Sequence, residues 1–463
     1  MPLKIIQTES KMLAMRVKQL CKEYGLILFV LFLLLMERLI ALRFLGVAYN
    51  LKSDDLSYIK AGIVFFDTHQ ITMHNVLSAQ IMPGMPVLIA LFVLVFGKGY
   101  MLWLSLKITW IIMGILSGLF IYKSIRIFAP KWAATLPVLF LLLPDFVWQD
   151  SLILTETPFM LALTIMMYAT FRLAETRRFK YFIVCLLSYL FALMLKVNIG
   201  VFPVFAGLYL VIKKYDIKLL LKQGFIAFCA LMIFVVPWTI RNYALYDAFI
   251  PLTYGVGNPM LRGTYQGANH PLDEELDYVT NVDHVMDKLY EKYIPKGYNY
   301  QAVLDGDVYV ESYIRKYLRL EYDKVKAEYR KEEWKAKDSS DMLYSYLVHK
   351  PMSMIYGEQS SFYWKELING TKSICIISRK IDLVLILLGT IASFIIKKYR
   401  AELAFLFAFY LSNIYIYSMT FAFDRYAQPL LVMRYVACGL SLYCLYLLVS
   451  KRFRKRTVDA LEG

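Results

Sequence analysis

The chain has 463 residues, of which 59% are hydrophobic and 19% are charged, and its mean hydropathy is +0.50. Soluble globular proteins are about half apolar and a quarter charged, so this composition excludes that class. The formal net charge of +16 does not indicate a nucleic-acid partner, because membrane proteins collect Lys and Arg in their cytoplasmic loops. Several apolar runs approach the ~20 residues that cross a bilayer, and the sequence therefore predicts an all-α polytopic membrane protein.

The first apolar run is expected to cross the membrane over residues 26–45. A basic segment, residues 1–25, precedes it and is expected to be cytoplasmic. The run is long and no small-residue cleavage site follows it, so we expect a retained span and no cleaved signal peptide. The chain then emerges into an outer loop, residues 47–99.

This outer loop is expected to hold short helices on the membrane surface over residues 55–80. Its later part contains Pro83 and Gly84, followed by an apolar run over residues 87–96 and then Gly97. The run is too short to cross a bilayer. It is therefore expected to be a surface or re-entrant helix.

Six more spans complete an N-terminal transmembrane catalytic module, expected over residues 1–240. They are expected over residues 100–122, 132–147, 151–171, 181–195, 199–212 and 225–240. With this topology the short loops rich in Lys and Arg all fall on one side of the membrane. That agreement with the positive-inside rule supports the assignment of the spans.

The stretch 241–375 is polar and rich in tyrosine, and it is expected to form one large extracytoplasmic region. Within it, residues 307–337 have the pattern of an amphipathic helix. The C-terminal unit, residues 376–463, carries three closing spans and a basic tail. These spans are expected over residues 376–396, 403–420 and 430–449. About ten spans of this kind predict a multi-pass protein of the cell membrane with both termini in the cytoplasm.

Cysteine and histidine give no sign of a metal centre. The six cysteines form no CxxC pair, so neither a disulfide framework nor a zinc site is indicated. The five histidines show no metal-ligand spacing and are expected to be exposed polar residues. No long internal repeat is evident, which disfavours a transporter built from repeated halves.

Unusual polar residues from distant parts of the chain lie near the outer ends of the expected spans. They are Asp54, Asp55, Glu156, Lys196, Arg241 and Arg425. Tyr58 follows Asp54 by about one helical turn, so the two side chains would share a helix face. Carboxylates and cations that gather at one leaflet indicate a site for an anionic lipid substrate.

Most of these residues have a structural alternative. The acidic pair could be a solvated loop that caps the next helix, and Glu156 could be an N-terminal acid favoured by the helix macrodipole. Lys196 could extend to the membrane interface, and Arg241 could be an interfacial anchor. Arg425 is a stronger functional candidate because it is packed with Tyr426 into one very short outer loop.

Taken in order, these motifs resemble those of the GT-C glycosyltransferases, in particular the bacterial relatives of the protein O-mannosyltransferase and aminoarabinose transferase group (glycosyltransferase family 39-like). The matching segments are Asp54-Asp55 with Tyr58, residues 83–97, the stretch around Glu156, residues 236–243, and Arg425-Tyr426 with Pro429. The chain departs from the family pattern at three places. Asp55 stands where that family has Glu, Lys196 where Arg is common, and Met82-Pro83-Gly84 where His-Pro-Pro is usual.

The resemblance implies a GT-C fold and transfer of a sugar from a polyprenyl-phosphate donor to an acceptor on the extracytoplasmic face. An acceptor hydroxyl needs a general base, and Asp54, just beyond the first span, is the expected base. Cations should stabilise the phosphate that leaves. The residues expected to bind the substrates are Tyr58, Lys196, Arg241, Arg425 and Tyr426. Direct displacement with one base predicts inversion at the anomeric carbon.

Asp55 and Glu156 are the further acidic candidates. They could hold the acceptor or a divalent cation, for which hard oxygen ligands favour Mg²⁺ or Mn²⁺. The transferred sugar could be a hexose or a pentose, and the acceptor a protein, a glycolipid or a polysaccharide. Two alternatives stay open. One is a transporter or flippase of a lipid-linked saccharide, which would need charges in mid-membrane, and the other is a non-catalytic scaffold.

Overall fold

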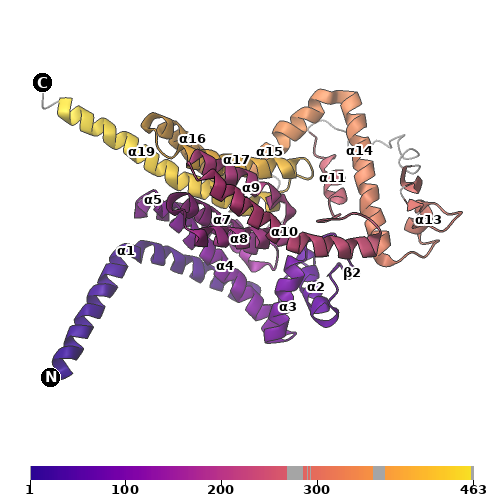
Figure 1. Cartoon of the computed structure of the whole chain (residues 1–463), viewed down its shortest axis with the longest axis horizontal. Coiled ribbons are helices and arrows are strands. Elements are labelled where there is room, and N and C mark those ends of the chain that lie inside the picture. Colours follow the sequence, from indigo (N-terminus) through magenta and orange to yellow (C-terminus); the bar gives the residue numbers. More distant parts are fainter. Residues whose placement is uncertain (1, 268–284, 289, 292, 358–370, 460–463) are drawn as a thin grey trace.

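The computed structural model describes residues 2–459 apart from 268–284, 289, 292 and 358–370. The described chain is almost entirely helical. Its helices form a bundle that holds the larger hydrophobic core, with a second, smaller core beyond it. α1 (Pro2–Leu45) and α19 (Leu431–Asp459) run to the two termini at one end of the molecule, and the helices of the polar region lie at the other end (Figure 1).

Six helical segments in the described part of the chain are long and apolar enough to cross a membrane. They are Glu23–Leu45 of α1, α4 (Tyr100–Arg126), α7 (Glu156–Thr176), α10 (Ile217–Tyr246), α17 (Arg400–Ser418), and Asp424–Lys451, which includes α18 (Asp424–Ala427), η4 (Gln428–Leu430) and most of α19. Each coincides with one of the spans expected from the sequence. The chain is thus a multi-pass membrane protein.

The expected span over residues 132–147 coincides with a pair of helices that is bent. α5 (Lys131–Thr135) and the 3₁₀ helix η1 (Leu136–Leu142) are followed by α6 (Pro144–Ser151) at an angle of 66°. The break falls at Leu143, whose backbone is extended (φ −67°, ψ 143°). A residue that precedes proline is pushed out of the helical region, so Pro144 accounts for the bend.

Three further expected spans coincide with helices outside the group of six. α8 (Phe179–Leu195) is apolar but has only 17 residues, and η2 (Val197–Val201) with α9 (Phe202–Ile212) is similarly short. α16 (Thr371–Ile396) carries Arg379, Lys380 and Asp382 in its first half. Arg379 and Asp382 face protein, where they pair with Asp145 and Arg434 respectively.

The loop expected over residues 47–99 holds two helices and a hairpin. α2 (Asp54–Thr68) packs against α3 (Gly84–Phe96) through Gly62, where an added Cβ would lie 2.4 Å from the Ile89 side chain. Between them, β1 (Thr72–Met73) and β2 (Val76–Leu77) pair antiparallel, with Thr72 opposite Leu77. Short helices were the only elements predicted here, so this hairpin corrects that prediction.

The polar region packs into a core of its own beyond the bundle. Its described helices are α11 (Gly257–Gly263), α13 (Tyr300–Asp305), α14 (Ser312–Tyr344), the π-helical turn η3 (Ser345–His349) and α15 (Lys350–Tyr356). The predicted amphipathic helix is α14, and its buried residues Ile314, Leu318 and Val325 recur at helical spacing. Tyrosines such as Tyr246, Tyr254 and Tyr290 fill the centre of this second core.

Candidate active site

Asp54 begins α2 at the junction between the bundle and the polar region. Its side chain is 30% exposed, and its two oxygens face different partners. Arg425 Nη2 lies 2.9 Å from Oδ2, and His74 Nε2 lies 3.5 Å from Oδ1. Burial acts to raise the pKa of this carboxyl, but the hydrogen bond from His74 and the charge of Arg425 outweigh it and hold the pKa of Asp54 well below its usual range. Asp54 is therefore an ionised carboxylate at neutral pH.

Arg425 connects the two carboxylates of the site. It lies in the short helix α18, and its Nε is 3.2 Å from Glu156 Oε1 while its Nη2 holds Asp54. Glu156 is the first residue of α7, with a side chain only 2% exposed, and Lys196 Nζ lies 3.0 Å from the same Oε1. Lys196 occupies the single position between α8 and η2. Two acids and two cations from four distant segments thus form one buried cluster.

Two tyrosines line this cluster. Tyr58 shares a helix with Asp54, and burial and the charge of Asp54 raise its pKa above its usual range, so its hydroxyl keeps the proton. Tyr426 follows Arg425, and its ring centroid lies 5.1 Å from Lys196 Nζ. Tyr417 stacks on Tyr426 with ring centroids 5.1 Å apart, which fixes the position of that ring. Tyr58 and Tyr426 therefore lie where the sequence-based prediction expected them.

The structure does not bring Asp55 into the cluster. Asp55 is buried, and its carboxylate accepts hydrogen bonds from the backbone N–H groups of Leu51 (2.7 Å), Ser53 (3.2 Å) and Leu56 (2.9 Å). The acid therefore orders the turn that leads into α2.

Arg241 also lies apart from the cluster. It extends from α10 to the hairpin, where it donates to the carbonyls of Ser78 (3.0 Å) and Ile71 (3.3 Å). Its guanidinium also stacks 4.9 Å from the ring of Trp238. Arg241 thus holds the hairpin against α10, and its effect on the site is indirect.

Two residues that the sequence-based prediction did not assign to the site join the cluster. His74 lies in the turn of the hairpin, where it and Asn75 both have positive φ (56° and 63°). Lys316 of α14 donates from Nζ to the Met73 carbonyl at 2.7 Å and lies 3.5 Å from His74 Nδ1. The adjacent His74 and Asn75 between two short apolar runs were a turn signal, but nothing local to Lys316 indicated its partner.

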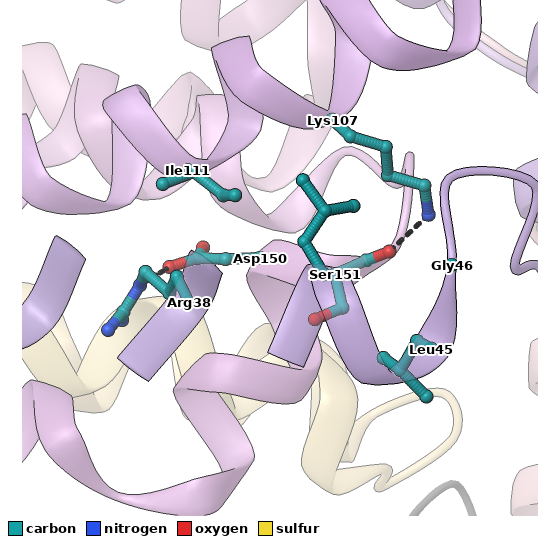
Figure 2. Close-up of a pocket in the computed structure, with 8 residues that line it drawn as sticks. Arg38, Leu45, Gly46, Lys107, Ile111, Asp150 and Ser151 are labelled. Atoms are coloured by element: carbon teal, nitrogen blue, oxygen red, sulfur yellow. Dashed lines mark hydrogen bonds and ion pairs between the residues drawn. The ribbon is translucent and has the colours of Figure 1, made fainter. Parts of the chain in front are cut away.

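A network around Lys107 anchors the loop that carries the acids. Lys107 of α4 donates from Nζ to the carbonyl of Tyr49 at 2.8 Å and to that of Ser151. Nearby, Arg38 of α1 pairs with Asp150 of α6 at 2.7 Å. Figure 2 shows the contacts of Lys107 with Ser151 and of Arg38 with Asp150 around a pocket that Leu45 and Gly46 also line. Buried charges placed in this way tie α1, α4, α6 and the loop before α2 together.

A small hollow lies beside Glu156 and Arg425. Its lining combines these two charged residues with apolar and amide side chains from α6, the segment before α7, and η4. They are Trp148, Gln149, Leu152, Leu154, Glu156, Arg425 and Gln428. The hollow therefore has apolar walls and one charged edge.

The acids of this region do not fit a shared divalent cation. Backbone N–H groups occupy both oxygens of Asp55, and two cations face Glu156. Over the described residues, no three His, Cys, Asp or Glu side chains are grouped to hold a metal ion. The cations that face Asp54 and Glu156 are instead the side chains of Arg425 and Lys196.

Residues 80–240 match the family described as dolichyl-phosphate-mannose-protein mannosyltransferase. The resemblance to the GT-C glycosyltransferases is confirmed over this segment. The segment includes Glu156 and Lys196 of the cluster and ends one residue before Arg241. No curated protein matches the chain significantly.

Solved structures similar to this chain include two membrane glycosyltransferases. One is ArnT from Cupriavidus metallidurans bound to undecaprenyl phosphate, at 12% identity and a TM-score of 0.41, over 91% of this chain and 78% of that one. The other is the apo oligosaccharyltransferase of Archaeoglobus fulgidus, at 12% identity and a TM-score of 0.49, over 96% of this chain and 52% of that one.

Proposed function

We propose that this protein transfers a sugar from a polyprenyl-phosphate donor to a hydroxyl acceptor on the extracytoplasmic face of the membrane. The observation that carries the proposal is the position of Arg425 between Asp54 and Glu156, with Lys196 on the far side of Glu156. This arrangement supplies an ionised base beside two cations. The matched family supports the class of donor, because dolichyl phosphate is a polyprenyl phosphate.

The proposed reaction is a single displacement. The acceptor oxygen attacks the anomeric carbon while its proton moves to the Asp54 carboxylate, and the bond between that carbon and the phosphate oxygen breaks. The phosphate leaves with the bonding electron pair, and Arg425 and Lys196 stabilise the negative charge that develops on it. Tyr58 and Tyr426 shape the space around the sugar.

Inversion at the anomeric carbon follows from this arrangement. A retaining reaction with a covalent intermediate would need a second carboxylate free to act as the nucleophile. Glu156 is held by Lys196 and Arg425 and is almost fully buried, so we assign it to positioning these two cations. A product that keeps the configuration of the donor would contradict this assignment.

The proposed side of the membrane rests on the topology. The basic short loops and both termini are assigned to the cytoplasm, and Asp54 lies at the opposite end of the first span. Figure 1 supports this, because α2 and the helices of the polar region lie away from the ends of α1 and α19 that carry the termini. The polar region would then cover the site from outside.

The test is sugar transfer in membranes that contain the wild-type chain or Asp54→Asn, with a panel of radiolabelled polyprenyl-phosphate hexoses and pentoses. A general base contributes about 10²- to 10⁴-fold to the rate, so the variant should lose transfer by that factor. Asp67→Asn on the same helix is the control, because Asp67 pairs with Lys98 at the exposed surface. Labelled lipid that crosses the membrane without transfer would instead support a flippase.

A further inference from the structure

His74 is held between the proposed base and a lysine from the polar region. Its Nε2 lies 3.5 Å from Asp54 Oδ1, and its Nδ1 lies 3.5 Å from Lys316 Nζ. The histidine itself is 48% exposed, but its backbone is fixed by the hairpin, and Lys316 also holds the neighbouring Met73 carbonyl at 2.7 Å. The Lys316 side chain of α14 therefore contacts both the turn of the hairpin and the His74 ring.

These contacts extend the cluster into a row of alternating charge-bearing groups. The row runs from the bundle to the polar region in the order Lys196, Glu156, Arg425, Asp54, His74 and Lys316. Each neighbour comes from a different segment of the chain. Asp54 lies between the residues of this row that belong to the bundle and His74 and Lys316, which lie outside it.

Lys316 determines which nitrogen of His74 carries the proton. A lysine ammonium group has no acceptor, so Nδ1 must accept from Lys316 through its lone pair. The neutral imidazole then carries its proton on Nε2, which points at Asp54 Oδ1. Burial lowers the pKa of Lys316 to about 8, and the ammonium form is therefore present at neutral pH.

We propose that His74 is a positioning residue for Asp54, that Lys316 sets its tautomer, and that the acceptor hydroxyl takes the place of His74 at Oδ1 during the reaction. Arg425 holds Oδ2 at 2.9 Å, so the oxygen that faces His74 at 3.5 Å is the one to be exchanged. The proposal rests on the proposed function, because it assigns a role toward the base of that reaction. Through Lys316 it also couples the polar region to the base.

The charged groups that face the imidazole are Asp54 from α2 and Lys316 from α14, and Arg425 faces it from α18 across Asp54. These contacts leave the Asp54 carboxylate between a guanidinium at Oδ2 and an imidazole at Oδ1.

The kinetic test compares His74→Gln, His74→Phe and Lys316→Met with wild type. A base displaced by about 1 Å can cost about 10²-fold, so His74→Phe should lower kcat by between about 10-fold and 100-fold while the KM for the donor changes little. His74→Gln keeps an N–H donor, so it should retain most of kcat. Equal losses of kcat in His74→Gln and His74→Phe, or no loss in either variant, would overturn the proposal. His69→Gln, at the residue that follows the last residue of α2, is the control.

A second measurement does not need activity. The full-length protein labelled with ¹⁵N-histidine is reconstituted in nanodiscs, and the ring signals of His74 are assigned by their loss in His74→Gln. We expect the Nε2–H tautomer in wild type, a changed Nε2 shift in Asp54→Asn and a changed Nδ1 shift in Lys316→Met. If the ring signals of His74 shift in neither Asp54→Asn nor Lys316→Met, the proposal is overturned. If these shifts appear but no donor supports transfer, the positioning contact stands and the proposed function fails.

Discussion

Arg425 Nη2 lies 2.9 Å from Asp54 Oδ2, although 371 positions separate the two residues in the chain. The contact joins α18, which follows α17, to the start of α2, which follows α1. The side chains are only 15% and 30% exposed, so water screens the pair weakly. The first and last parts of the membrane domain therefore meet at the residue that we propose as the base.

Replacing Arg425 by Gln is expected to abolish both ion pairs at the site. Loss of one preorganised donor to a developing oxyanion costs about 10²- to 10³-fold in kcat, and Arg425→Gln should lose at least this much. Arg425→Lys should not restore activity, because an ammonium group cannot reach Asp54 and Glu156 in the fork geometry of a guanidinium. Initial transfer rates in membranes with matched protein levels measure this.

The control for this substitution is Arg400→Gln, which changes an arginine at the far end of the bundle that donates to backbone carbonyls. It should leave the transfer rate unchanged. Full transfer by Arg425→Lys would contradict the bridging role assigned to Arg425.

Glu156→Gln is expected to lower the stability of the protein by more than a substitution at an exposed ion pair would. The substitution leaves Lys196 and Arg425 buried without their shared carboxylate, and removal of one partner of a buried ion pair costs about 3–5 kcal/mol. The double variant Glu156→Gln/Lys196→Met should recover part of this loss, because it removes one uncompensated charge. Thermal unfolding in detergent measures both effects.

Glu175→Gln is the matched control for Glu156→Gln, because Glu175 pairs with Lys213 but is 40% exposed. Exposed pairs contribute only about 0–1 kcal/mol. Equal losses of stability in Glu156→Gln and Glu175→Gln would show that burial does not govern the energetics of the Glu156 pairs.

The amino-acid sequence predicts much of this arrangement, because hydropathy and the placement of basic loops depend on local composition. The run around Glu156 and the single Lys196 between two apolar runs were both placed at the outer face from that information. Tyr58 was placed beside Asp54 by helix periodicity alone. The local sequence pattern therefore identified residues of the candidate site, and the predicted topology placed them on one side of the membrane.

The parts that the sequence-based prediction missed depend on contacts between distant segments. Asp54 and Asp55 are adjacent acids with the same local pattern, yet one faces Arg425 and the other binds backbone N–H groups. Only the backbone path of the loop before α2 determines which of the two carboxylates faces Arg425. Lys316 lies in a helix with many charged residues, and only the docking of α14 on the hairpin distinguishes it from the others.

Lys107→Met is expected to lower the rate of sugar transfer, although we do not expect Lys107 to contact the substrate. Lys107 holds the Tyr49 carbonyl of the loop before α2, and loss of this anchor should let the proposed base move. Since Asp55 orders the same loop through Leu51 and Ser53, the effects of Lys107→Met and Asp55→Asn should be less than additive. Transfer rates of the single and double variants test this.

Lys123→Met, at the other end of the same helix, is the control for Lys107→Met. Cleavage of the loop before α2 by an added protease should rise in Lys107→Met and not in Lys123→Met. Fully additive effects of Lys107→Met and Asp55→Asn would instead mean that the two residues act on separate features.

Lys350 provides a prediction for the dependence of stability on pH. This lysine is fully buried beside Tyr346 and Thr420, and burial, reinforced by the charge of Lys331, lowers its pKa from 10.5 to about 6. Between these two pKa values the unfolded chain binds more protons at this position than the folded chain does. Stability due to Lys350 should therefore rise as the pH increases from about 6 to 10.5.

Lys350→Met removes this dependence, because methionine has a similar length and carries no proton. The variant should be more stable than wild type at neutral pH, and the difference should shrink as the pH rises toward 10. Apparent Tm values between pH 6 and 10 measure it, with Lys335→Met as the control because Lys335 is 58% exposed on α14. A lower Tm for Lys350→Met at pH 7 would mean that the ammonium form is retained and stabilised by its contact with the Tyr346 ring, 3.5 Å from Nζ.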